Sequence, residues 1–91
     1  MRLTYTFNVA WQVILDTLYL RDERNSFIYA LDNVGKDFWL LIGKLHDYEA
    51  IRAELLKSYD VEERVLDADM TGLTELLVEK GFIAASGELA K

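Results

Sequence analysis

The sequence predicts an α+β fold, a three-stranded antiparallel sheet followed by three helices, and a change of hydrophobic period carries this prediction. Apolar residues alternate with polar ones up to about residue 31, and from Asp32 onward they recur at helical spacing. A chain of 91 residues can bury a single core. We therefore expect one domain at residues 1–84 and a loose C-terminal tail at residues 85–91.

Three stretches before Asp32 have the pattern of strands. Odd positions from Leu3 to Leu15 are apolar, which indicates one strand or two collinear strands. Residues 17–22 alternate again, and the charged connection at residues 22–25 joins them to residues 26–31 as a hairpin. From Phe27 to Leu31 every side chain is apolar, so both faces of this last strand need a cover.

Two helices are expected between Asp32 and Tyr59. Asp32 or Asn33 can cap the first helix, and Gly43 is expected to end it. Asp47 can cap the second helix, which places its apolar residues along one side.

A third helix is expected from about Glu62 to Lys80, with Gly81 as its C-terminal stop. Acidic residues in its first turn suit the helix dipole. At about 100° per residue, four apolar side chains fall in one narrow core arc. These residues are Leu66, Met70, Leu73 and Leu77.

Val65 and Leu76 lie beside this core arc, next to Asp69 and Gly72. The two apolar side chains extend the apolar surface of the helix. Either these residues widen a buried face, or they form the wall of a groove. In a groove, Gly72 lets another backbone approach and offsets its helix cost of about 1 kcal/mol relative to Ala. Close packing of Gly72 against the domain's own sheet is the alternative.

Composition and charge exclude several classes of function. The 16 acidic and 10 basic residues give a net charge of −6, which repels nucleic acid and anionic membrane surfaces. The chain has no Cys, so disulfides and thiolate metal sites are excluded. It has neither a continuous apolar signal segment nor the run of about 20 apolar residues that crosses a bilayer. We expect a globular, water-soluble, cytoplasmic protein.

The residues that could carry catalysis do not form a recognised constellation. His46 is the only histidine, and no nucleophile pairs with it. The sequence contains no Gly-rich phosphate loop and no paired histidines for zinc. The segment from Asp60 to Lys80 holds seven acidic and two basic residues, the wrong sign for a helix that reads DNA. We expect no catalytic residue, no cofactor and no metal site.

Three segments resemble the PqqD-like family. Residues 67–83, DADMTGLTELLVEKGFI, are similar to its C-terminal signature, and residues 29–45, YALDNVGKDFWLLIGKL, resemble its Leu-Asn segment and following helix. Residues 51–61, IRAELLKSYDV, resemble its helix that ends in Tyr-Asp-Val. The signature positions are Asp69, Met70, Leu73, Leu77, Gly81, Phe82 and Ile83. The likeness spans about residues 12–83. It departs from the family at Asp32, where Asn is usual, and at Thr74, where an apolar residue is common, and the second departure leaves open how the outer side of the third helix is used.

The resemblance implies a winged-helix-type domain that recognises the leader segment of ribosomally made, later modified peptides. In such domains the leader adds a strand to the third strand of the sheet, in the groove between that strand and the third helix. Residues 27–31 contain no Lys, Pro or Gly to protect such an edge. Cover by another strand or by the N-terminal segment is the alternative.

The expected peptide-binding residues lie on these two elements. They are Ser26, Phe27, Ile28, Tyr29, Ala30, Leu31, Val65, Asp69, Gly72, Leu73 and Leu76. Asp69 is expected near a polar or basic group of the leader. Spacing leaves open whether Phe27, Tyr29 and Leu31 or the alternate residues of the strand meet the peptide.

The resemblance implies two pathways. Stand-alone domains in lasso-peptide maturation hold the precursor's leader for a separate leader peptidase and a separate cyclase, and the alternating N-terminal segment with Tyr5, Phe7 and Trp11 favours this assignment. The alternative is the partner protein of pyrroloquinoline-quinone assembly, which presents its precursor to a radical enzyme. In both cases the chain is not an enzyme and binds neither nucleic acid nor membrane.

Overall fold

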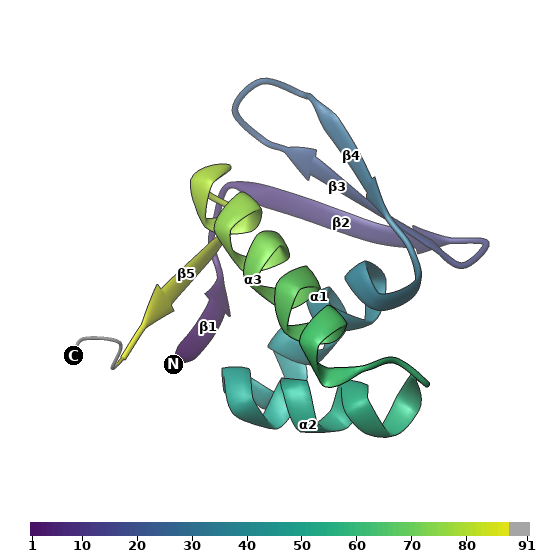
Figure 1. Ribbon diagram of the computed structural model, residues 1–91. Helices are drawn as coiled ribbons and strands as arrows, with labels where there is room; N and C mark the ends of the chain where they lie inside the picture. The colour runs from purple at the N-terminus through teal and green to yellow at the C-terminus, as the bar shows by residue number, and fades with distance from the viewer. Residues whose placement is uncertain (88–91) are drawn as a thin grey trace.

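The computed structural model describes residues 1–87 and contains two small sheets and three helices (Figure 1). Four strands precede the helices and a fifth follows them. In chain order the elements are β1 (Arg2–Tyr5), β2 (Val9–Ile14), β3 (Thr17–Asp22), β4 (Ile28–Leu31), α1 (Asn33–Leu45), α2 (Tyr48–Ser58), α3 (Glu63–Glu79) and β5 (Ile83–Ser86).

The expected antiparallel sheet is formed by β2, β3 and β4 in that order. Leu18 of β3 pairs with Leu31 of β4, and Tyr19 pairs with Ala30. Leu18 and Leu20 are fully buried, whereas Tyr19 between them is exposed. One face of the sheet therefore covers the core, and the other face is open.

The N-terminal alternation requires a correction. It covers two strands of different sheets, since β1 pairs with β5 and β2 pairs with β3. The chain turns between them at residues 6–8, where the Thr6 N–H donates to the Phe82 carbonyl at 3.0 Å and the Thr6 hydroxyl donates to the Gly81 carbonyl at 2.6 Å. These bonds tie the turn to the end of α3, a distant segment that alternation cannot reveal.

The C-terminal strand β5 lies beside β1 and runs to Ser86. It therefore includes Ala85 and Ser86, which we expected to begin the tail. Residues 88–91, the rest of the expected tail, lie outside the described residues.

The first helix is two residues longer than expected. α1 passes through Gly43 to Leu45, and His46 ends it with φ 60°. Gly43 is explained by a contact with β1: its N–H donates to the Tyr5 hydroxyl at 3.1 Å, and a Cβ at this position would lie 2.8 Å from that oxygen. Tyr5 in turn donates to the Trp39 carbonyl at 2.5 Å. Gly43 thus permits a close approach and is not a helix stop.

The second helix begins directly after Asp47, as expected, and the third is one residue shorter than expected at each end. Asp47 caps α2, with its carboxylate accepting from the Ala50 N–H at 2.9 Å. Gly81 follows the end of α3 with φ 79°, the left-handed conformation that favours glycine. The two helices are joined by Arg52, which donates to Asp67 at 2.6 Å and to Glu63 at 3.0 Å.

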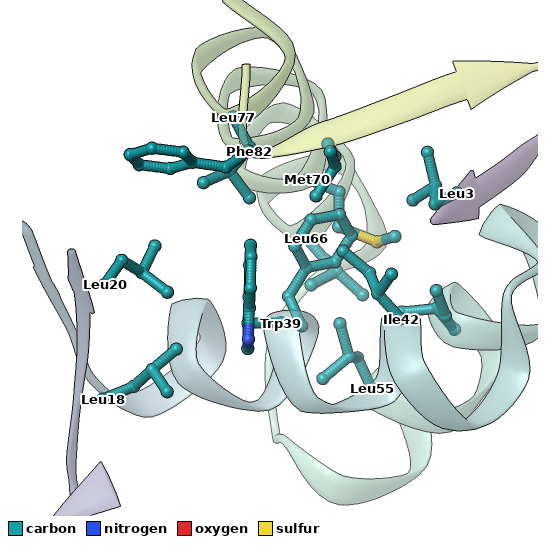
Figure 2. Close-up of a cluster of buried hydrophobic side chains, with 13 residues drawn as sticks. Leu3, Leu18, Leu20, Trp39, Ile42, Leu55, Leu66, Met70, Leu77 and Phe82 are labelled. Atoms are coloured by element: carbon teal, nitrogen blue, oxygen red, sulfur yellow. The ribbon is translucent and has the colours of Figure 1, made fainter. Parts of the chain in front are cut away.

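The core lies between β3, the helices and the β1–β5 ribbon. Figure 2 shows Leu18 and Leu20 directed toward Trp39 of α1, with Phe82 and Leu77 above it. The remaining buried apolar residues are Leu3, Phe38, Ile42, Ile51, Leu55, Leu66, Met70 and Ile83.

The buried face of α3 differs from the predicted core arc at one position. Leu66, Met70 and Leu77 are buried, but Leu73 is half-buried and Thr74 takes a core position at 9% exposure. Thr74, where the family commonly has an apolar residue, therefore lies in the core. The face that α3 buries is turned toward Thr74, which leaves Leu73 at the margin of the core.

Candidate functional site

The strand β4 is a free edge of its sheet: within residues 1–87 it pairs with β3 alone. In an antiparallel ladder, successive residues direct their N–H and C=O groups to opposite sides of the strand. The Phe27 carbonyl accepts a bond from β3 at 2.9 Å. By the same alternation Tyr29 and Leu31 bond toward β3, so the backbone groups of Ile28 and Ala30 point to the free edge.

The side chains of β4 are divided between two faces. Tyr29 and Leu31 are half-buried and share the core face with the buried leucines of β3. Ile28 and Ala30 are exposed on the outer face of the sheet. The side chains of Tyr29 and Leu31 therefore face the helices, and those of Ile28 and Ala30 point away from them.

Two residues expected in this strand precede it. Ser26 has φ 65°, and its N–H donates to the Asp22 carbonyl at 2.8 Å, which makes it part of the turn between β3 and β4. Phe27 follows this turn with its side chain 61% exposed. The strand begins at Ile28, and Ser26 cannot be part of it because a left-handed residue interrupts the extended backbone.

A hollow of about 300 Å³ lies where β4, α1 and α3 meet. It brings together four of the expected site residues, Ala30 and Leu31 of β4 with Asp69 and Leu73 of α3. Three further lining residues, Asp32, Val34 and Gly35, were not predicted. Their position directly after the strand is the sequence signal that could have found them.

The remaining expected residues of α3 lie exposed on the helix side that also carries Asp69. Val65 is 39% exposed and Leu76 is 41% exposed. A Cβ added to Gly72 would meet no atom within 4 Å, so this glycine is not packed against the domain's own sheet. Val65, Asp69, Gly72 and Leu76 are spaced at three or four residues, which makes them one continuous stripe beside the hollow.

The other end of β4 faces the C-terminal end of α3. The Lys80 ammonium lies 5.5 Å from the centre of the Tyr29 ring, and that ring meets Phe82 edge-on at 5.5 Å. We did not predict Lys80 as a site residue. The ammonium group of Lys80 lies at one end of the space between β4 and α3, and the carboxylates of Asp32 and Asp69 lie at the other end.

Arg24 links the turn before β4 to the end of α3. The Arg24 guanidinium donates to the Asp22 carboxylate at 3.0 and 3.1 Å and to the Lys80 carbonyl at 2.5 Å. Asp22 is 3% exposed, and its bonds to Arg24 hold the pKa of this carboxyl below its ordinary value. This clamp holds the two walls of the groove together at the Tyr29 end.

The outer face of the sheet carries a second, wider hollow of about 450 Å³. Its lining includes Tyr19 and Ile28, whose side chains are 38% and 64% exposed. It adjoins the free edge of β4 from the side opposite α3.

The chemistry of these residues suits binding. In the described part of the chain, no three His, Asp or Glu side chains converge as metal ligands. His46 is half-buried beside the Leu3 carbonyl at 3.4 Å, where it ends α1. Among residues 1–87, no helix is both long and apolar enough to span a membrane.

A winged-helix-type domain with an open strand edge beside its third helix is the class that this fold and groove define. Residues 17–83 match the sequence model of the family described as coenzyme PQQ synthesis protein D (PqqD). The chain belongs to this PqqD family, as the sequence predicted. A comparison with curated protein sequences gives no match.

Two solved structures share the fold over nearly the whole chain. One is TbiB1 in complex with the TbiA(beta) leader peptide, with a TM-score of 0.82 and 20% sequence identity, covering 93% of this chain and 99% of that one. The other is lasso peptide synthetase B1 complexed with its leader peptide, with a TM-score of 0.81 and 16% identity, covering 93% and 100%. The predicted α+β architecture is therefore confirmed.

Proposed function

We propose that this protein is a non-catalytic recognition protein for the leader segment of a ribosomally synthesised precursor peptide of the lasso type. The leader adds as an extended strand to the free edge of β4 and lies in the groove between β4 and α3. The protein then presents the precursor to a separate leader peptidase and a separate cyclase. Its peptide-binding residues are Ser26, Phe27, the residues of β4, Leu73 and the α3 stripe described above.

The open edge of β4 is the observation that carries this proposal. Ile28 and Ala30 leave their backbone groups without a strand partner in residues 1–87, and the strand has no charge, proline or bulge that would block pairing. Any extended chain can bond to such an edge, so selectivity must come from side-chain pockets beside it. The hollow between β4 and α3 is such a pocket.

The comparisons support the same assignment. Both similar structures are complexes with a leader peptide, and the second is a lasso peptide synthetase. Family membership supports recognition of a precursor peptide as the general function. The description of the family favours a second candidate, a partner protein in quinone-cofactor synthesis that presents its precursor to a radical enzyme.

The test uses charge substitutions on α3 and isothermal titration with synthetic leader peptides of lasso-type precursors. Leu76→Asp and Val65→Asp should each weaken binding at least about tenfold, because a contact with the peptide would bury an unpaired carboxylate. Both residues are already well exposed, so folding should survive, as circular dichroism can verify.

Val78→Asp is the matched control. Val78 is 42% exposed on the same helix, but it lies on the side away from the Val65–Leu76 stripe, and its substitution should leave binding unchanged. If both stripe variants fold and bind as tightly as the parent, the peptide does not lie on this helix. Binding of a leader from a quinone-type precursor in place of a lasso-type leader would select the second candidate.

A further inference from the structure

We propose that the hollow at the α1 end of the groove is a subsite for a lysine or arginine side chain of the bound peptide. The carboxylates of Asp32 and Asp69, on opposite walls, would receive the cation, and Leu31, Val34 and Leu73 would hold its aliphatic stem. This inference rests on the proposed function and adds the kind of residue that the groove selects.

The first support is that both carboxylates are free within residues 1–87. Asp32 is the N-cap residue of α1, yet its side chain accepts no capping bond, although an aspartate here ordinarily binds an N–H of the first turn. Lys36, one turn further on, pairs at 3.5 Å with Asp16 instead. Asp69 has no hydrogen-bond or ion-pair partner in the same range of residues, whereas Asp67 on the same helix is paired with Arg52.

The second support is the apolar surface between the two carboxylates. Leu31, Val34 and Leu73 are half-buried and pack against the core, so they form a fixed apolar surface. Gly35 keeps this surface open, because an added Cβ would contact Leu31 at 3.5 Å and Leu73 at 3.7 Å. Long cationic side chains cover apolar surface with their stems while their charged ends remain at polar groups.

The other kinds of side chain fit less well. A purely apolar side chain would take water away from two carboxylates without replacing it, which is unfavourable. An acidic side chain would be repelled by both. At the opposite end of the groove, Lys80 over the Tyr29 ring has the opposite charge, so a basic residue is favoured only at the α1 end. The groove therefore selects where along the peptide the cation lies.

A displayed library of random peptides provides the test without knowledge of the natural leader. The intact protein and the Asp32→Asn/Asp69→Asn double variant are each used to select binders from the same library. Lys or Arg should be enriched at one position among peptides selected on the parent, and this enrichment should disappear on the double variant. Enrichment of binders without a basic position would overturn the subsite and leave the proposed function standing. Failure to select any binder that Leu76→Asp weakens would overturn both.

A titration on one selected peptide then measures the pairing itself. Replacing its basic residue by Met, which keeps a similar stem without the charge, should weaken binding to the parent about tenfold. The double variant should bind the basic and the Met peptide within about twofold of each other. Asp60→Asn, an exposed position before α3, is the control and should keep the full difference. An undiminished preference for the basic peptide in the double variant would overturn the assignment of Asp32 and Asp69.

Discussion

Ala30→Pro offers a direct test of strand addition, because it removes one backbone donor from the free edge of β4. The ladder alternation directs the Ala30 N–H outward, so proline here leaves the bonds between β3 and β4 in place. Proline is tolerated in edge strands when its nitrogen faces solvent. The variant should therefore fold.

The expected loss follows from the bond that the peptide can no longer make. A backbone hydrogen bond contributes about 0.5–1.5 kcal/mol net, and a carbonyl left unpaired in the complex costs about 1–3 kcal/mol. Leader binding should weaken by roughly fivefold to a hundredfold. Isothermal titration measures this loss, and circular dichroism with thermal melting establishes that the fold is retained.

Two variants separate the backbone effect from other effects of the substitution. Ala30→Val enlarges the side chain and keeps the N–H, so it measures the steric part. Val13→Pro makes the same backbone change on β2, where alternation directs the N–H to the opposite edge of the sheet. It should leave binding within about twofold of the parent. Wild-type affinity in a folded Ala30→Pro variant would refute addition of the leader to β4.

Two further predictions concern stability. Thr74→Val should raise the free energy of unfolding by about 1 kcal/mol, and Tm by about 4–8 °C, because the buried Thr74 hydroxyl has no partner within residues 1–87. The exposed Thr71→Val is its control, and an equal gain there would contradict the explanation. Asp22→Asn should lower Tm near pH 7. Since Arg24 lowers the pKa of Asp22 in the folded state, this stabilisation is present above the ordinary carboxyl pKa of about 4 and is lost as pH falls through the lower folded value. Melting curves should therefore show parent and variant converging at acidic pH, and a difference in Tm that stays constant below pH 4 would contradict it.

The resemblance to the PqqD family implied a groove between β4 and α3, and each of these two elements also has a local signature in the sequence. The apolar run before Asp32 marks β4 as a strand without edge protection, and helical spacing marks Val65 and Leu76 as a surplus beside the core arc. Asp69 and Leu73 were assigned to the same groove, and the structure brings them to one hollow with Ala30 and Leu31.

The sequence by itself determined that a strand-rich segment precedes three helices, the capping of α2 by Asp47 and the glycine after α3, since these depend on residues close together in the chain. Only the tertiary structure decided that β1 and β2 belong to different sheets, because β1 pairs with β5, a strand about 80 residues away. It also decided that Gly43 makes room for Tyr5 and that Thr74 replaces Leu73 in the core. Periodicity defines a stripe on a helix, but the rotation of that helix against its neighbours is set by packing between distant segments. The presence of Asp32 and Asp69 in the lining of one hollow has the same origin.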